Sequence, residues 1–153
     1  MTIDQRLAEL GITLPVAAAP VAAYVPTVEV GGLLHVSGQI SFAEDGSLIK
    51  GRLGDDVDVD GGMAAARRCG VMLLAQIKAA LGSLDRVDRI VKLGVFVNST
   101  ADFTDHPKVA NGASELMVEV FGEAGKHARA AVGVAALPLG VAVEVDAVVA
   151  IKA

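Results

Sequence analysis

The chain has few of the residues that build disulfide-bonded, metal-binding or nucleic-acid-binding proteins. Its one cysteine, Cys69, excludes a disulfide within the chain. The three histidines, His35, His106 and His127, lack the spacing of metal ligands. With 13 Lys and Arg against 18 Asp and Glu, the net charge is −5, and no basic cluster is large enough to neutralise a phosphate backbone. We therefore expect no metal site and no nucleic-acid partner.

Long apolar runs are also missing. The longest uncharged stretches, 10–28 and 130–143, are broken by proline or glycine, so neither gives the roughly 18 unbroken apolar residues of a membrane-spanning helix. The first residues mix acidic and basic side chains, unlike a signal peptide. We expect a cytoplasmic protein with no membrane partner, built as a single domain over 1–153 in which 1–15 form an N-terminal extension.

Aromatic residues make up only 3% of the chain, and there is no tryptophan, although 53% of the residues are hydrophobic. Alanine and valine supply most of this hydrophobicity. Because small side chains bury little area each, association of subunits is one way to gain the missing apolar contacts. Cys69 lies in a helical pattern with no histidine near it in sequence, so we expect it to pack rather than to react.

Hydrophobic periodicity predicts two hairpin strands, a helix, a strand, a helix and two further strands, after a short helical pattern and an extended lead-in. Glycine, proline and aspartate mark the turns and helix ends between them. The predicted elements are a short helix at 1–11, the lead-in at 14–23, strands at 25–30, 33–40, 87–97, 128–135 and 141–151, and helices at 63–81 and 107–121.

Local signals refine these elements. Gly31-Gly32 predicts a tight hairpin turn, and either Asp58 or Asp60 is placed to cap the first long helix. In the strand at 87–97, a strict period of two puts residues 91, 93, 95 and 97 on one face and Ile90 and Phe96 on the other.

Charged residues in the two apolar C-terminal strands require a reason, because such residues are rarely buried without one. In the last strand, Glu144 and Asp146 share one face and valines share the other. Arg129 is the only charge in the strand before it. A guanidinium there can anchor a carboxylate ligand by two parallel hydrogen bonds, or form a structural salt bridge with Glu144 or Asp146.

These motifs resemble the Rid (YjgF-type) family of imine and enamine deaminases, from roughly Ala23 to the C-terminus. The strongest part of the resemblance is Arg129-x-x-Val132-x-Val134-x-x-Leu137-Pro138-x-x-Val141-x-Val143-Glu144-Val145-x-Ala147. Supporting segments are Tyr24-Val25, Val36-Ser37-Gly38-Gln39-Ile40, Val95-Phe96-Val97 with Asp102-Phe103, and Asn111 on the second long helix.

The resemblance implies an α+β fold of the chorismate-mutase-like kind, a mixed β-sheet with two helices on one face. It further implies a homotrimer whose three sheets form a central barrel, with active sites between neighbouring subunits. The activity implied is cofactor-free hydrolytic deamination of reactive imines and enamines, such as 2-iminopropionate and 2-aminoacrylate, to a 2-keto acid and ammonia.

The resemblance also implies roles for particular residues. Arg129 would anchor the substrate carboxylate, and Glu144 would place a water and carry a proton. The substrate-binding residues implied are Tyr24, Ser37, Gly38, Asn111 and Ala131. Each has a plain structural alternative: an interface charge for Glu144, core packing for Tyr24 and Ala131, a turn for Ser37-Gly38, and a local hydrogen bond for Asn111.

The sequence departs from the family pattern at several places. The segment 102–111 is about four residues longer than in common members, and Pro26, Ala130 and Ala131 replace other residues usual there. Two alternatives therefore stay open: a pathway enzyme for a larger, 2-aminomuconate-like acid, and a non-catalytic trimer that binds a small carboxylate or acts as a chaperone. The pairing of Arg129 with Glu144 favours catalysis, and the acidic charge opposes a ribonuclease.

Overall fold

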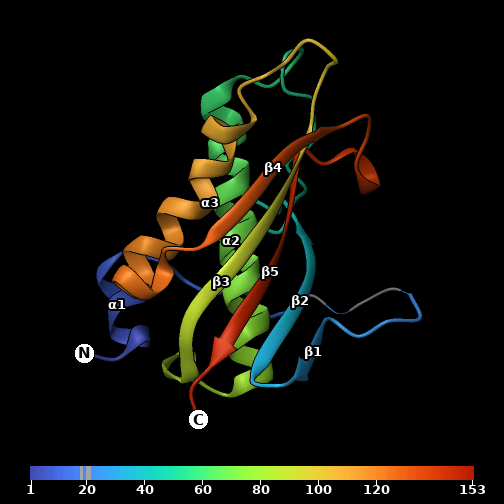
Figure 1. Cartoon of the computed structure of the whole chain (residues 1–153). Helices are drawn as coiled ribbons and strands as arrows, with labels where there is room; N and C mark the ends of the chain where they lie inside the picture. The colour runs from blue at the N-terminus through green and yellow to red at the C-terminus, as the bar shows by residue number, and fades with distance from the viewer. Residues whose placement is uncertain (18, 20–21) are drawn as a thin grey trace.

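A computed structural model of the chain describes residues 1–17, 19 and 22–153. The predicted order of strands and helices is confirmed (Figure 1). The lead-in predicted at 14–23 falls partly outside the described residues. The main elements are α1 (Ile3–Glu9), β1 (Thr27–Val30), β2 (Leu33–Ile40), α2 (Val59–Leu81), β3 (Val87–Asn98), α3 (His106–Phe121), β4 (Ala128–Val134) and β5 (Val143–Ile151), with short 3-10 turns η1 (Leu84–Arg86), η2 (Gly122–Gly125) and η3 (Pro138–Gly140).

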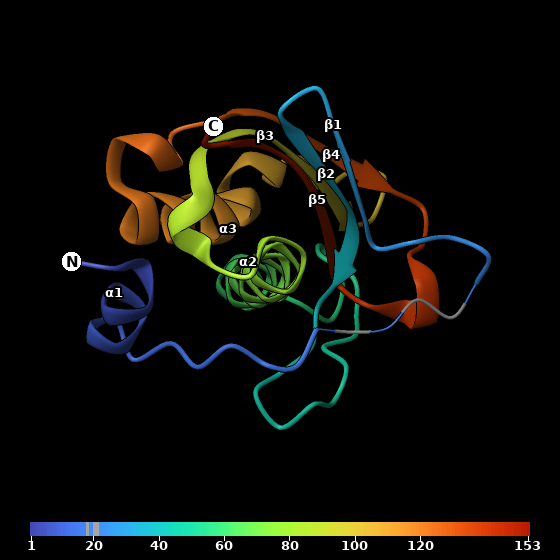
Figure 2. The same ribbon diagram turned by 90° about the horizontal axis from the view of Figure 1, so that it is seen from below.

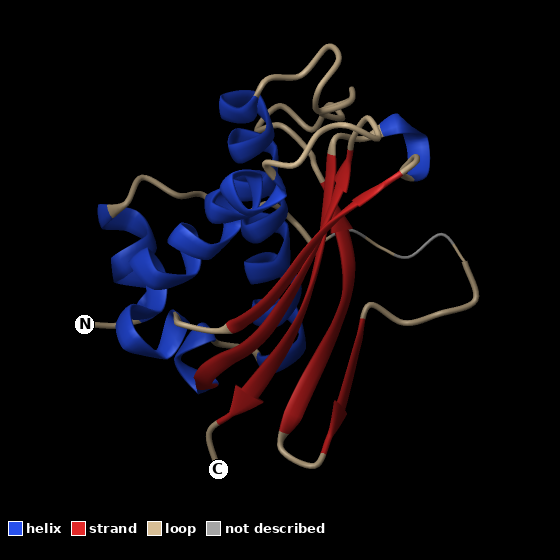
Figure 3. Cartoon of the chain, turned by 45° about the horizontal axis from the view of Figure 1, so that its top comes forward, coloured by secondary structure: helices blue, strands red, loops and turns tan. Residues whose placement is uncertain are grey.

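The five strands form one mixed sheet in the order β1-β2-β5-β3-β4. β3 and β4 run parallel, and the other neighbouring pairs are antiparallel. Seen end-on, the sheet is an arc with α2 and α3 on its inner side (Figure 2). The same division into a helical layer and a sheet is visible in Figure 3. The predicted α+β architecture, a mixed sheet with two helices on one face, is thereby confirmed.

Capping residues explain where α2 begins and ends. The side chain of Asp58 accepts a hydrogen bond from the backbone N–H of Gly61 at 2.7 Å, so the helix starts four residues before the predicted Met63. Asp58, rather than the alternative Asp60, is therefore the cap. Gly82 ends the helix with a positive φ of 82°, a conformation that glycine adopts without steric cost.

The β1–β2 hairpin turns at Gly31-Gly32, as predicted, with φ angles of 59° and 77°. β1 begins at Thr27, two residues later than expected. Pro26 lies just before it and has no N–H for the ladder, but its carbonyl accepts from the N–H of Ser37 at 2.9 Å.

The face prediction for β3 is wrong at Ile90. Its register with β5 shifts between Ile90 and Lys92, so Ile90 turns to the same side as Leu93 and is fully buried. Val91 is only half-buried. The strict period of two failed because a bulge adds a residue to the strand.

The core lies between the helices and the sheet, and Cys69 belongs to it. The thiol is fully buried, with its Sγ 3.3 Å from the carbonyl oxygen of Val143. Burial, with a smaller effect of the Glu144 charge, raises the pKa of the Cys69 thiol far above its usual range. The expectation that Cys69 packs rather than reacts agrees with this environment.

The opposite face of the sheet, which we call the open face, is not covered by α2 or α3 (Figure 2). Val28 and Val30 of β1 and Val132 of β4 are 51%, 60% and 47% exposed. Small side chains such as Ala128 and Ala130 continue this surface along β4. Within the described residues, no helix has the length and apolar character needed to cross a membrane.

Candidate functional site

The predicted site residues fall into two groups on different sides of the sheet. The first, called the edge group, consists of Arg129 and Ala131 on β4 and Asn111 on α3. The second, called the open-face group, consists of Ser37 and Gly38 on β2, Glu144 on β5 and Tyr24 in the segment before β1.

Arg129 reaches from β4 onto α3. Its Nη1 donates to Asn111 Oδ1 at 2.9 Å and to Ser114 Oγ at 3.1 Å, and its Nη2 donates to the Pro107 carbonyl at 3.4 Å. Asn111 and Ser114 are three residues apart on the helix and so share one face. Arg129 and Asn111, two of the residues expected at the site, are therefore in direct contact. Ala131, two residues along the strand, is half-buried against the core.

A second pair of polar residues, which the sequence reasoning missed, supports Arg129. His127 Nε2 lies 2.8 Å from Ser114 Oγ, and His127 Nδ1 lies 2.6 Å from the Gly125 carbonyl oxygen. The pKa of His127 is lowered, chiefly by burial and also by the charge of Arg129. The hydrogen bond to the Gly125 carbonyl has the opposite effect and raises this pKa. The two-residue spacing of His127 and Arg129 could have indicated that they lie together, because residues 127 and 129 share one face when a strand continues through them.

The open-face group is built on a β-bulge. Val36 pairs with Ala147 and Gln39 with Val145, so β2 uses one residue more than β5 between these pairs. The extra residue lies at Ser37-Gly38. A side chain at Gly38 would overlap Glu144 Oε2, so the absence of a Cβ there lets the carboxyl group lie directly against the β2 backbone.

Two buried amides support this bulge from the helical side. Gln39 Nε2 donates to the Ser37 carbonyl at 3.2 Å, and Gln76 Nε2 on α2 donates to Gln39 Oε1 at 3.3 Å. Gln39 and Gln76 are only 7% and 3% exposed. A buried amide needs such partners, so the pair fixes the carbonyl of the bulge. Gln39 was named only as part of the segment 36–40, and Gln76 was not predicted, although each is a polar residue within an apolar pattern.

Glu144 has an environment suited to holding a proton. Burial chiefly, and the nearby charge of Asp146, raise the pKa of Glu144 above its usual range. In the described part of the chain, no hydrogen bond or ion pair to its carboxylate is found. Asp146, by contrast, accepts from the backbone N–H of Gly94 at 3.0 Å.

The structure does not bring Arg129 and Glu144 together within one chain. Arg129 pairs with Leu93 and turns to the helical side with it, whereas Glu144 pairs with Phe96 on the open face. Two strand spacings, or about 10 Å, separate β4 from β5, with the sheet between the side chains. The alternative of a structural salt bridge from Arg129 to Glu144 or Asp146 is therefore wrong within one chain, because the guanidinium binds α3 instead.

Tyr24 lies in the segment that approaches the bulge. It is 51% exposed, so the alternative of core packing is wrong. Two residues later, the Pro26 carbonyl binds Ser37. The main chain after Tyr24 is therefore fixed next to the open-face group.

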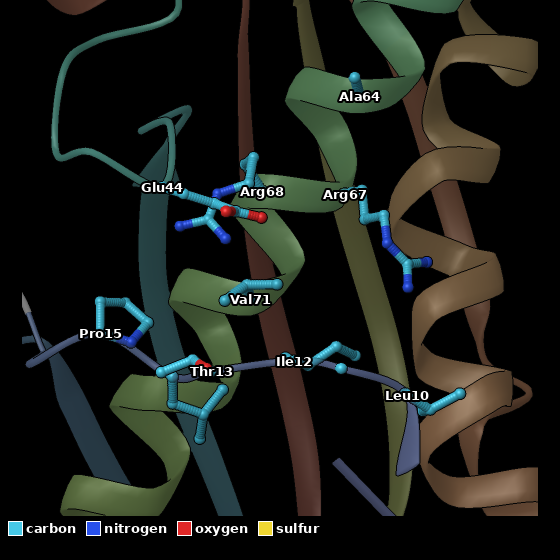
Figure 4. Close-up of a pocket in the computed structure, with 11 residues that line it drawn as sticks. Leu10, Ile12, Thr13, Pro15, Glu44, Ala64, Arg67, Arg68 and Val71 are labelled. Carbon is cyan, nitrogen blue, oxygen red and sulfur yellow. The ribbon is translucent and has the colours of Figure 1, made fainter. Parts of the chain in front are cut away.

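Three hollows in the described part of the chain lie elsewhere, and none of the predicted site residues lines any of them. One, of about 530 Å³, lies between the N-terminal segment and α2 (Figure 4). There Arg67 points toward α3, where it pairs with Glu119 at 3.0 Å. Two more, of about 620 Å³ and 380 Å³, both include Phe103 in their lining, and Ser99 and His106 also line the smaller one. Across residues 1–17, 19 and 22–153, no three His, Cys, Asp or Glu side chains cluster as metal ligands would.

Comparisons with known proteins give consistent similarities. Residues 4–149 match a family model described as "YjgF/chorismate mutase-like, putative endoribonuclease". The chain is 56% identical to protein TCP17 of Trypanosoma cruzi, over 96% of this chain and 92% of that protein. It is 28% identical to a 2-iminobutanoate/2-iminopropanoate deaminase of Dermatophagoides farinae, over 92% of this chain and 95% of that protein. The solved structure of Atu1372 from Agrobacterium tumefaciens, a protein described as of unknown function, superposes with a TM-score of 0.91 at 49% identity, covering 98% of this chain and 92% of that one.

Proposed function

Because the chain belongs to the YjgF/chorismate mutase-like family, we propose that it hydrolyses imines and enamines of small 2-amino acids to 2-keto acids and ammonia. A relative that is 28% identical over most of both chains carries the name of such a deaminase. The proposal needs no cofactor, since the imine carbon is already electrophilic. What the chain must supply is a carboxylate anchor, a placed water and a group that moves a proton.

The observation that carries the proposal is the state of the Arg129 guanidinium. Both Nη1 hydrogens and one Nη2 hydrogen are used by α3. Among the described residues, Nε has no partner and Nη2 has one, so one hydrogen of Nη2 remains. We place this hydrogen beside the Nε–H, where the two form the parallel pair that binds a carboxylate.

Glu144 suits the proton transfers. As a carboxylate it takes a proton from water while the water oxygen bonds to the carbon of the protonated imine and the C=N electron pair moves to nitrogen, which gives a neutral carbinolamine. The protonated Glu144 then gives this proton to the nitrogen of the carbinolamine. The C–N bond breaks and ammonia leaves, while the hydroxyl proton returns to the Glu144 carboxylate and the C=O bond of the keto acid forms. A carboxyl group with a raised pKa and no competing partner is well matched to both steps.

We propose that the two groups meet between subunits of a homotrimer. A three-carbon imino acid is too short to touch Arg129 and Glu144 of the same chain, since the sheet separates them. The open face also exposes Val28, Val30 and Val132, which favours contact with another copy. In this arrangement the edge group of one chain lies against the open-face group of its neighbour.

The proposal is tested by generating 2-aminoacrylate in situ with a serine or threonine dehydratase and following pyruvate and ammonia formation. The chain should accelerate both, and Arg129→Ala should remove the acceleration. Arg67→Ala is a matched control, because Arg67 also binds α3, through Glu119, but lies at the hollow between the N-terminal segment and α2. If wild-type trimer leaves the spontaneous rate unchanged with this substrate, the small-imine proposal fails.

The remaining alternatives give different results in the same assay. An enzyme for a larger, 2-aminomuconate-like acid would be active with that substrate alone, and a non-catalytic binder would bind pyruvate without turnover. For nucleic acids we propose no function, because the net charge of −5 offers little counterion release. A sub-micromolar RNA complex that weakens steeply with salt would contradict that view.

A further inference from the structure

A continuous chain of hydrogen bonds runs from the Arg129 guanidinium to a backbone carbonyl. It passes from Arg129 Nη1 to Ser114 Oγ at 3.1 Å, from Ser114 to His127 Nε2 at 2.8 Å, and from His127 Nδ1 to the Gly125 carbonyl at 2.6 Å. Its residues come from β4, α3 and the η2–β4 junction, so it links three parts of the fold next to the edge group.

The two ends of this row of hydrogen bonds determine which group donates and which accepts at each step. The Gly125 carbonyl can only accept, so the His127 Nδ1 carries a hydrogen. In the neutral ring, Nε2 is then the acceptor for the Ser114 hydroxyl hydrogen. Ser114 therefore presents oxygen lone pairs to Arg129, whose guanidinium can only donate. Every group donates in the same direction, which favours a single orientation of the Ser114 hydroxyl.

On this basis we infer that Ser114 and His127 are positioning residues, which hold Arg129 so that its Nε and Nη2 edge is free for the carboxylate of a substrate. The inference deepens the proposed function and rests on it. Ser114 and Asn111 together occupy Nη1. Without Ser114, the guanidinium can rotate about its terminal bonds, and the edge left for the ligand is no longer fixed.

The charged groups around His127 decide how its protonation responds to a ligand. Arg129 on β4 disfavours the protonated ring. Around η2, Lys126 and Glu123 pair with each other at 2.8 Å, and Arg89 of β3 binds the Lys126 carbonyl. From α3 the ring meets the neutral Ser114, and Glu115 beside it is exposed.

A carboxylate bound to Arg129 would neutralise the positive charge that acts on His127. The pKa of His127 should therefore rise when the site is filled, by roughly half a pH unit for a charge several ångströms away in a partly solvated site. By linkage, protonated His127 should favour the bound carboxylate by the same factor. The rise therefore reports that the carboxylate binds at Arg129, and the affinity of a Ser114 variant reports the positioning.

Proton NMR provides the test, because the chain has only three histidines. The ring protons of His35, His106 and His127 are titrated in the folded wild-type protein with and without saturating pyruvate, and His127→Gln assigns the third signal. We expect pyruvate to raise the midpoint of His127 and to leave the other two in place. Ser114→Ala should weaken pyruvate binding about 10-fold, as expected for one lost hydrogen bond to a charged group.

Two variants separate positioning from stability. Ser114→Thr keeps the hydroxyl and should bind pyruvate nearly as the wild type does. Ser99→Ala breaks the other serine–histidine pair, in which Ser99 Oγ lies 3.2 Å from His106 Nε2, and should change neither the pyruvate affinity nor the His127 midpoint. Melting temperatures measured on the same samples confirm that each variant is folded.

The outcomes are distinct. If pyruvate binds through Arg129 but His127 does not respond, or if Ser114→Ala binds pyruvate as tightly as wild type, the positioning role is overturned and the proposed function stands. If wild-type protein binds no pyruvate at any pH, the carboxylate anchor fails, and the positioning role falls with it.

Discussion

The β4–α3 edge and the open face both carry charged side chains on apolar strands, but they hold them differently. At the edge, Arg129 makes three hydrogen bonds to α3, and His127 holds one of the partners, Ser114, in place. On the open face, Glu144 lies against the Gly38 backbone without a hydrogen bond among the described residues, and its pKa is raised. The difference suits the two tasks we propose, since an anchor must be rigid and a proton carrier must be free to change charge.

The largest expected effect comes from removing the proton carrier. Glu144→Gln keeps the shape of the side chain but cannot take a proton from water, so kcat/KM for the imine should fall by about 100-fold or more. The dehydratase-coupled assay measures this, with Glu29→Gln on β1 as the exposed glutamate control. Activity within a factor of two of wild type would reduce Glu144 to the interface charge that the sequence left open.

Removing the anchor should be nearly as damaging. Arg129→Ala leaves the substrate carboxylate without its parallel N–H pair, which should cost roughly 30- to 1,000-fold in kcat/KM. Arg129→Lys keeps the charge without the planar fork and should also be severely impaired. Retained activity in a correctly assembled Arg129→Ala trimer would contradict the mechanism.

Mixing the two inactive variants tests whether the edge and the open face meet between chains. If each site takes Arg129 from one subunit and Glu144 from the next, a mixed trimer of Arg129→Ala and Glu144→Gln chains keeps one intact site. After denaturation and refolding of an equimolar mixture, random assembly should restore about a quarter of wild-type activity. Light scattering gives the oligomer mass. No recovery in mixed trimers would mean that the two groups do not share a site.

The sequence allowed prediction of what depends on local pattern. Helix α2 and its Asp58 cap, the Gly31-Gly32 turn and the alternation of Glu144 and Asp146 follow from residues close together in the chain. Arg129 and Asn111 were each named from a family pattern, but their contact through Nη1 and Oδ1 is seen only in the structure.

The features that escaped prediction depend on distant partners. The bulge at Ser37-Gly38 exists only in the pairing of β2 with β5, about 100 residues later, and the shift at Ile90 likewise needs β5. Whether Arg129 and Glu144 share a face depends on how β4 joins the sheet. His127 and Ser114 meet because α3 packs beside β4, and neither residue carries that information locally.

The open-face carboxylates should also set the acid side of the pH–rate profile. Glu144 must be ionised to accept a proton, and its raised pKa places the acid limb of kcat/KM above the usual carboxyl range. Asp146 contributes to that shift through its charge, so Asp146→Asn should move the limb to lower pH while keeping an oxygen for the Gly94 N–H. Asp88→Asn, an exposed change on β3, is the control. A limb that stays in place would show that another group limits activity at low pH.

The smallest expected effect concerns stability and has the opposite sign to the effect on activity. Because the pKa of Glu144 is raised by folding, the folded chain holds this proton more tightly than the unfolded chain. The stability contributed by Glu144 is thus fully present below its unfolded pKa and is lost as pH rises through its folded pKa. Glutamine cannot ionise and avoids that loss. Glu144→Gln should therefore melt higher than wild type at pH 7, by no more than a few degrees, and the difference should shrink toward the acid end.

Calorimetry of the two proteins across this pH range isolates Glu144, because every other titrating group is common to both. The oligomer mass is recorded at each pH, so that a change in assembly is not taken for a change in stability. Glu29→Gln should show no comparable difference. If Glu144→Gln instead melted lower at pH 7, its charge would be a stabilising one, and the open face would hold its carboxylate as firmly as the edge holds Arg129. The division between a rigid anchor and a strained proton carrier would then be lost.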